Sequence, residues 1–165
     1  MSDRVLSVRS RQRQVKLDQK LLRTIVNWLL AEELGLKKYE LSLQFVGAKE
    51  ITALNENFLH HEGSTDVITF DYGNSREQSM VVGDVIICVD EAIAQAPRFR
   101  STWQTELVRY VVHGVLHLLG FDDKTSAKRK RMKRREDDLV GRIAQRFTLS
   151  RIGARRLASR KSRRI

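Results

Sequence analysis

The segment HGVLHLLGFDD contains the residues best suited to chemistry in this chain. His113 and His117 are four positions apart, so on one helix their side chains point to the same side, one turn apart. That spacing lets two imidazoles bind one metal ion, as in helical zinc sites. Gly120 allows the chain to turn back, which brings Asp122 or Asp123 round as a third ligand. Three protein ligands leave a fourth position open for water, as catalytic metal sites do.

The same helix also invites comparison with metallopeptidases. In their H-E-x-x-H pattern the glutamate acts as the general base. Here that position is Gly114, which cannot move a proton. The pattern therefore indicates a metal-dependent hydrolase whose water activation relies on the metal and on another group. The alternative to a metal site is that His113 and His117 are ordinary helix residues.

Two aspartates, Asp66 and Asp84, each lie near the start of an expected strand. A carboxylate in such a position can orient a ligand histidine or hold the attacking water. The alternative is a structural role, such as capping a turn. We take both as candidate catalytic residues.

The hydrophobic pattern predicts a few strands. Leu41, Leu43 and Phe45 alternate with polar neighbours, which is typical of a half-buried strand. Two further strands are favoured by the run TDVITF, which is rich in β-branched residues, and by the longer apolar run MVVGDVIICV. The expected strands cover residues 4–9, 39–46, 65–70 and 80–89.

Helices are expected between these strands. Asp18 can cap a first helix and Gly35 can stop it. Ser101 and Gln104 have the spacing of a capping box for the helix that carries the two histidines. The expected helices cover residues 18–34, 48–60, 90–96, 101–120 and 125–147. Strands and helices are mixed without strict alternation, so we expect an α+β fold, a small mixed β-sheet backed by helices.

The charge is concentrated at the C-terminal end. Residues 124–165 have a net charge of +14, whereas residues 1–123 have a net charge of −3. This asymmetry favours a polyanionic partner, nucleic acid ahead of membrane, over a solvated tail that only aids solubility. We expect one domain over residues 1–147 and a basic C-terminal tail over residues 148–165. The residues expected to bind RNA, unless they form only a solvated helical face, are Lys128, Arg129, Lys130, Arg131, Lys133, Arg134 and Arg135.

Composition also bears on the compartment. The N-terminal residues include arginines but no apolar run, so they do not form a secretory signal. No apolar run is long enough for a membrane span. The single cysteine, Cys88, excludes an internal disulfide and is consistent with a reducing compartment. We therefore expect a cytoplasmic protein with no membrane partner.

At the histidine motif the sequence resembles the YbeY family of bacterial endoribonucleases, whose signature is H-G-x-L-H-L-x-G-[FY]-D-H. Two further blocks of that family have counterparts in LNENF followed by TDVITF, and in GDVII. After the metal motif the family has a helix with a methionine and a glutamate four apart, here Met132 and Glu136. The resemblance covers roughly residues 40–140.

The resemblance implies an α+β fold, one divalent metal ion, usually assigned as zinc, and cleavage of single-stranded RNA. It implies a role in maturing the 3′ end of small-subunit ribosomal RNA and in ribosome quality control, with ribosomal proteins as partners. Carried over residue by residue, it makes His113 and His117 the first two metal ligands and position 123 the third.

Two departures from the family pattern affect these expectations. The family has histidine as its third ligand, whereas this chain has Asp123. A carboxylate can bind zinc, but two histidines with one carboxylate also suit iron or manganese. The family often has an arginine where this chain has Leu59, so His60 and His61 either replace it as phosphate ligands or are surface loop residues.

Two other functions compete with the endoribonuclease. One is a metallopeptidase-like hydrolase, and the other is a non-catalytic ribosome-binding factor that relies on the basic end. Assays on single-stranded RNA and on unstructured protein distinguish the metallopeptidase from the endoribonuclease. Metal analysis distinguishes the binding factor, which needs no stoichiometric metal.

Overall fold

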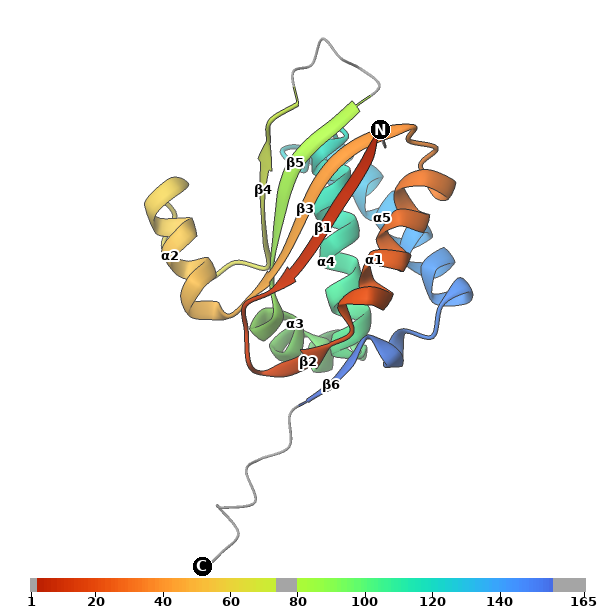
Figure 1. The fold of residues 1–165 in the computed structure, drawn as a ribbon. Helices are drawn as coiled ribbons and strands as arrows, with labels where there is room; N and C mark the ends of the chain where they lie inside the picture. Colours follow the sequence, from red (N-terminus) through yellow and green to blue (C-terminus); the bar gives the residue numbers. More distant parts are fainter. Residues whose placement is uncertain (1–2, 74–79, 156–165) are drawn as a thin grey trace, which may run out of the picture.

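Four strands form the main sheet, in the order β1-β3-β5-β4 (Figure 1). The structure is a computed structural model and describes residues 3–73 and 80–155. β1, β3 and β5 run parallel, and β4 pairs antiparallel with β5 at one edge, so the sheet is mixed. All four expected strands are confirmed, each within two residues of its predicted ends. The observed strands are β1 (Arg4–Ser10), β3 (Lys38–Val46), β4 (Val67–Asp71) and β5 (Met80–Cys88).

The expected helices are confirmed as well, which makes the fold α+β. A π-helical turn, Leu29–Glu33, continues the first helix, and a 3-10 turn, Ala96–Phe99, forms around Pro97 after the third. None of the helices in the described residues has both the length and the apolar character needed to cross a membrane. The observed helices are α1 (Gln19–Trp28), α2 (Ala48–Phe58), α3 (Val89–Gln95), α4 (Trp103–Leu118) and α5 (Ser126–Arg146).

The two faces of the sheet are covered differently. The alternating residues Leu41, Leu43 and Phe45 join the main core, to which α1, α4 and α5 contribute. On the opposite face a smaller cluster, which includes Ile51 of α2 and Ile86 of β5, packs separately. Figure 1 shows α1, α4 and α5 on one side of the sheet and α2 on the other. Strand alternation therefore decides which side chains reach α4 and which point away from it.

The helix caps agree with the sequence in one case and differ in another. The Asp18 carboxylate accepts a hydrogen bond from the Leu21 N–H at 3.0 Å, as predicted. The capping box expected at Ser101 is wrong, because Thr102 is the N-cap and accepts from the Thr105 N–H at 3.1 Å. Gln104 instead donates its amide to the Gly153 carbonyl at 3.0 Å. The distant C-terminal segment thus uses the side chain that a local capping box would need.

Part of the expected C-terminal tail is folded into the domain. Leu149–Ile152 form a 3-10 turn in which both Leu149 and Ile152 are buried. The following strand β6 (Gly153–Arg155) pairs antiparallel with β2 (Val15–Leu17). The packed part of the described chain therefore reaches Arg155, and the rest of the expected tail, 156–165, lies outside the described residues.

Candidate metal centre and its pocket

Helix α4 lies tightly against the sheet next to the two histidines. A Cβ atom added at Gly114 would lie 2.5 Å from Cγ1 of Val85, and it would also meet Val67 and Thr69. The absence of a side chain at this position therefore lets α4 approach β4 and β5. A glutamate at position 114 would have to displace Val85 or the helix, so the packing here disfavours the peptidase base.

The Nδ1 atom of each histidine ring is held by an acceptor. Nδ1–H of His113 donates to Oε2 of Glu136 at 2.8 Å, and Nδ1–H of His117 donates to the Phe121 carbonyl at 3.1 Å. Ionised carboxylates and carbonyls only accept hydrogen bonds, so these partners assign the proton to Nδ1 in both neutral rings. The Nε2 atoms then carry the lone pairs that a metal ion would use.

These two Nε2 atoms face each other at 3.0 Å. With both lone pairs turned inward, the contact is unfavourable unless a cation or a shared proton lies between the rings. Ligands on adjacent corners of a zinc tetrahedron are about 3.3 Å apart, given bond lengths of about 2.0–2.1 Å. The spacing of the two nitrogens is close to that value, so the pair fits a bound metal ion.

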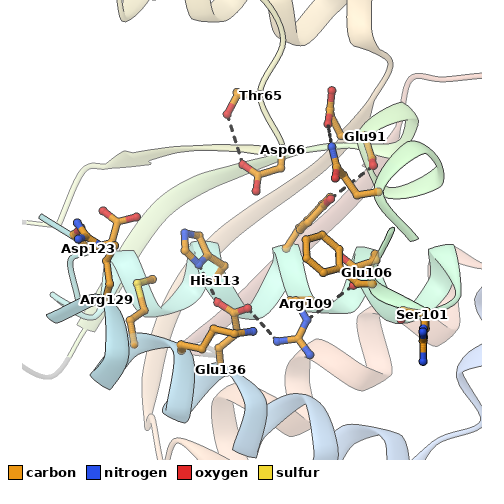
Figure 2. Close-up of a pocket in the computed structure, with 16 residues that line it drawn as sticks. Thr65, Asp66, Glu91, Ser101, Glu106, Arg109, His113, Asp123, Arg129 and Glu136 are labelled. Atoms are coloured by element: carbon orange, nitrogen blue, oxygen red, sulfur yellow. Dashed lines mark hydrogen bonds and ion pairs between the residues drawn. The ribbon is translucent and has the colours of Figure 1, made fainter. Parts of the chain in front are cut away.

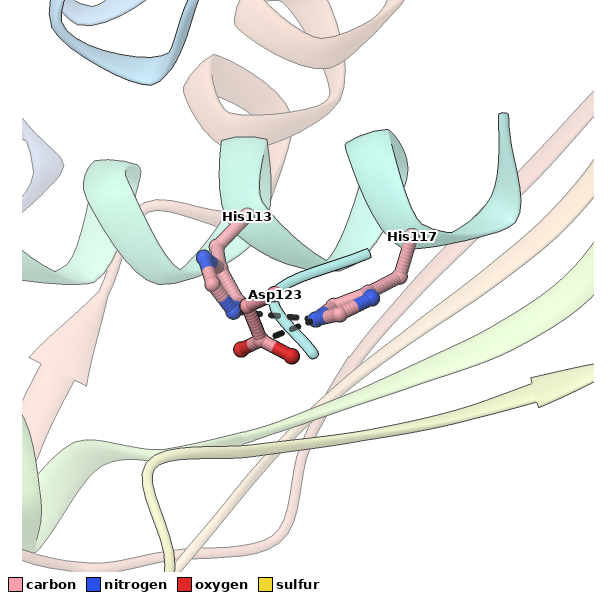
Figure 3. Close-up of side chains that lie close together, drawn as sticks. All are labelled: His113, His117 and Asp123. Atoms are coloured by element: carbon pink, nitrogen blue, oxygen red, sulfur yellow. Dashed lines mark hydrogen bonds and ion pairs between the residues drawn. The ribbon is translucent and has the colours of Figure 1, made fainter. Parts of the chain in front are cut away.

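Asp123 completes the group. Gly120 has φ 97°, a conformation that favours glycine, and it reverses the chain after α4. An oxygen of Asp123 then lies 4.0 Å from Nε2 of His117, and one ligand atom from each of the three residues falls within 4.8 Å of the others. Figure 3 shows the three side chains converging on one point. His113, His117 and Asp123 could therefore hold a metal ion together.

Asp122, the alternative third ligand, is directed elsewhere. Its Oδ1 accepts from the Lys124 N–H at 3.0 Å, and its Oδ2 accepts from Nζ of Lys128 at 3.2 Å. Both contacts favour the charged carboxylate and hold the pKa of Asp122 below its usual value. The geometry thus separates the two neighbouring aspartates, and only Asp123 is in the candidate metal group.

An ion-pair network around the buried Glu136 supports His113 from the side of α5. Nη1 of Arg109 donates to Oε1 of Glu136 at 3.0 Å and to Asp137 at 2.6 Å. Burial raises the pKa of Glu136, but its hydrogen bonds with His113 and Arg109 outweigh burial and hold that pKa below its usual value. Glu136 is therefore an ionised acceptor that fixes the tautomer and orientation of the His113 ring.

The two rings differ in their proton affinity. Burial lowers the pKa of His113, but the hydrogen bond to Glu136 and nearby negative charges outweigh it, so the pKa is raised. Burial and the adjacent His113 lower the pKa of His117. When the protein holds no metal, a shared proton therefore belongs mainly to His113. A metal ion would have to displace that proton, as ligand binding at histidines generally requires.

A pocket of about 930 Å³ opens beside the metal-binding residues. His113 and Asp123 are at one end of it, and Ser101 is at the other, as Figure 2 shows. Asp66 faces this pocket from the segment before β4, and its carboxylate accepts from the Val67 N–H at 2.8 Å. Asp66 therefore lies in the same pocket as His113, as a catalytic carboxylate must.

Asp84 lies elsewhere, so its position does not support the catalytic role expected for it. It alternates along β5 with Gly83 and Val85, which face α4, and so points to the other side of the sheet. There its Oδ2 accepts from the Tyr72 hydroxyl at 2.9 Å. The sequence placed Asp84 on a strand but did not show which face of that strand meets the histidine helix.

The expected RNA-binding residues divide around α5. Arg129 and Lys133 line the pocket, and a guanidinium nitrogen of Arg129 donates to the Asp123 carbonyl at 3.2 Å. Lys128 pairs with Asp122, and Arg135 pairs with Asp138. The remaining members are exposed and do not line the pocket, namely Lys130, Arg131 and Arg134. Leu59, His60 and His61 are also exposed and outside the pocket lining.

Two residues that support His113, Glu136 and Arg109, were not predicted from the sequence as site residues. Glu136 was noted only for its spacing from Met132, and Arg109 was not noted. One signal was available for Glu136, because an acidic residue following the strongly basic run KRKRMKRR is conspicuous. Its hydrogen bond to His113 depends on the packing of α5 against α4, which the sequence pattern did not show.

Comparisons with known proteins point to one family. A family model described as endoribonuclease YbeY matches residues 7–144. A protein of Chlorobium phaeovibrioides named endoribonuclease YbeY is 36% identical over 121 residues, which span 73% of this chain and 79% of that protein. One of the same name from Elusimicrobium minutum is 40% identical over 109 residues, covering 65% of this chain and 73% of that protein. The solution structure of TM1509 from Thermotoga maritima matches with a TM-score of 0.61 and 26% identity, over 84% of this chain and 89% of the other.

Proposed function

Because the chain belongs to the endoribonuclease YbeY family, we propose that it cuts single-stranded RNA at a metal held by His113, His117 and Asp123. One observation carries this proposal: two Nε2 atoms face each other at 3.0 Å while both Nδ1 atoms are engaged by acceptors. In that arrangement the Nε2 lone pairs of both imidazoles are directed at a position that one cation can occupy. The nearby carboxylate of Asp123 adds the negative charge that such a cation attracts.

We propose zinc as the metal. Two imidazoles and one carboxylate form a common ligand set of catalytic zinc sites. When bound, such an ion acts as a Lewis acid that acidifies water and offsets charge on phosphate oxygens. Iron and manganese also accept this ligand set, so elemental analysis is part of the test.

The residues around the metal group have distinct proposed roles. Glu136 holds the His113 ring, and Arg109 in turn holds Glu136. Asp66, an exposed carboxylate in the same pocket, accepts the proton of the attacking group as a general base. Arg129 and Lys133 contact phosphates of the RNA on the side of α5.

We further propose that the substrate is precursor ribosomal RNA, cut near the 3′ end of the small-subunit RNA, and that the protein acts in ribosome quality control in the cytoplasm. Two observations support this. The chain is similar over most of its length to proteins named endoribonuclease YbeY. Its net charge over residues 124–165 is +14, which suits binding to a large polyanion such as a ribosomal particle.

The experiment compares three substrates: a single-stranded RNA, the same RNA in a duplex, and an unstructured protein. Each is incubated with purified protein before and after chelation, and after zinc is added back. We expect cleavage of the single strand alone, lost on chelation and in His117→Ala, and restored by zinc only in the wild type. Cleavage of the protein substrate, or RNA cleavage unchanged in His117→Ala, would overturn the proposal. Small-subunit particles with unprocessed 3′ ends then test the cellular substrate by sequencing of the RNA ends.

A further inference from the structure

The pocket continues well beyond the metal-binding residues. Its lining follows α4 from His113 back through Arg109 and Tyr110 to Glu106, and it also includes Phe99, two residues before Ser101 in the chain. Glu106 and His113 are seven positions apart on the helix, a rise of about 10 Å. A phosphate at the metal end would therefore leave room for a neighbouring nucleotide along α4.

Glu106 is an unusual group at this place. Its residue is only 4% exposed, yet it lines the pocket. Nε of Arg109 lies 3.8 Å from its carboxylate, and the Nη1 atom of that arginine is directed to Glu136 and Asp137. Within residues 3–73 and 80–155, no hydrogen bond reaches the Glu106 carboxylate. Every fully buried side-chain oxygen in those residues has a hydrogen-bond partner. The Glu106 oxygens have none, so they are not fully buried and are accessible from the pocket that Glu106 lines.

The accessible Glu106 oxygens accept no hydrogen bond from the described protein groups, so a ligand in the pocket can bring N–H groups to them. Burial raises the pKa of Glu106, and the charges of Glu136 and Asp66 act in the same direction, while Arg109 opposes them. The ionised carboxylate offers two acceptor oxygens and no donor. Among the RNA bases, guanine alone presents two adjacent donors, N1–H and N2–H, on its Watson–Crick edge.

Phe99 provides a second, independent feature at the same end. It is 66% exposed and lines the pocket next to Arg100 and Ser101. A large exposed aromatic ring at the rim of an RNA-cleaving pocket suits stacking on a base. Figure 2 shows Glu106 between Arg109 and Ser101, so its carboxylate lies on the stretch of α4 that leads to this rim.

We propose that this end of the pocket is a guanine-binding subsite of the RNA substrate. The Glu106 carboxylate accepts hydrogen bonds from N1–H and N2–H of guanine, and the Phe99 ring stacks on the base. The subsite rests on the proposed endoribonuclease function, since it places a guanosine at a fixed distance from the cleaved bond. It adds a base preference that the metal group by itself cannot supply.

The test digests a single-stranded RNA of random sequence and sequences the product ends. Wild-type protein should enrich guanine at one fixed position relative to the cut. Glu106→Gln presents one donor and one acceptor, which the Watson–Crick edge of every base can match, so it should lose that enrichment. Phe99→Ala should raise KM for a guanosine-containing oligonucleotide by about tenfold, since each stacked base contributes appreciably to binding. Glu40→Gln, an exposed change on the other face of the sheet, is the matched charge control.

Several outcomes overturn the subsite. One is an identical base preference in wild type and Glu106→Gln, and another is the absence of any preference in the wild type. If the wild type cleaves no RNA, the proposed function fails, and binding then decides the subsite separately. In that case the probe is a labelled uridine decamer with or without one guanosine. Tighter binding of the guanosine probe by wild type but not by Glu106→Gln supports the subsite, and equal binding of both probes refutes it. Thermal unfolding checks that each variant is folded.

Discussion

Glu136 on α5 accepts a hydrogen bond from Nδ1–H of His113 on α4 at 2.8 Å, across the contact between the two helices. Its other oxygen accepts from Arg109 at 3.0 Å, so both carboxylate oxygens are engaged. The basic helix therefore contributes more than positive charge, because a buried acid within it sets the direction of a metal-binding ring. That arrangement links the packing of α4 and α5 to the geometry of the site.

Replacing Glu136 with glutamine should weaken metal binding. The amide cannot serve both His113 and Arg109 as an acceptor, so the His113 ring loses its fixed orientation. Loss of such a supporting partner typically lowers metal affinity by about 10–100-fold. Competition with a chromophoric zinc chelator measures the change.

Asp137→Asn is the matched control for that variant. Asp137 also accepts from Arg109, at 2.6 Å, but makes no contact with His113. Its replacement should leave the zinc affinity within about threefold of wild type, well below the effect of losing a supporting partner. Equal losses in the two variants would show that the charge of the network matters and the direct contact does not.

Replacing each of two helical glycines with alanine should have opposite effects on the stability of the protein. At Gly114 the new Cβ would lie 2.5 Å from Val85, so Gly114→Ala should destabilise the metal-free protein by about 1–3 kcal/mol. At Gly141 no atom lies within 4 Å of such a Cβ, so Gly141→Ala should stabilise it by about 0.5–1 kcal/mol. Urea denaturation measures both. If Gly114→Ala were as stable as wild type, the close approach of α4 to the sheet would not be what requires glycine there.

Local patterns predicted much of this fold. Signals that depend only on neighbouring residues were confirmed. They are the helix cap at Asp18, the strand alternation over 39–46 and the helical spacing of His113 and His117. The close grouping of the two histidines follows from helix geometry alone. Gly120 and the turn after it then bring Asp123 to them.

What the sequence did not show depends on contacts between distant segments. The face on which Asp84 lies is decided by how the sheet packs against α4. The role of Glu136 depends on a contact 23 residues away in the chain. Residues 153–155 pair with residues 15–17, near the other end of the chain. The basic composition of the C-terminal segment gave no indication of this strand. The periodicity of a sequence predicts a helix or strand, but it does not predict which other element packs against it.

The salt dependence of RNA binding should identify the basic residues that contact phosphates. Arg129 and Lys133 line the pocket, whereas Arg131 is exposed and does not. For single strands, each lost phosphate contact should reduce the slope of log K against log salt by about 0.7. Arg129→Ala and Lys133→Ala should each show that reduction, and Arg131→Ala should show less. Equal slopes in all three variants would contradict a path for RNA along the pocket side of α5.

The stability of the metal-free protein should depend on pH through Glu106. Burial raises the pKa of this carboxyl above its ordinary value of 4.5. The native state then holds a proton that the unfolded chain releases, so stability falls as pH rises from about 4.5 through the raised pKa. Glu106→Gln cannot ionise, and its stability relative to wild type should therefore increase across that window. Urea denaturation from about pH 4 to about pH 8 measures the difference. A difference that stays constant with pH would contradict this account of Glu106.

The most direct test of the central claim is the ratio of metal to protein, measured by elemental analysis after dialysis of wild type, His117→Ala and Asp123→Ala. The three side chains lie close enough to hold one ion between them. The account predicts one divalent ion per chain in the wild type, with zinc as the metal, and loss of that ion in both variants, each confirmed as folded by circular dichroism. A wild type that binds no ion, or an Asp123→Ala protein that retains its full complement, would contradict it.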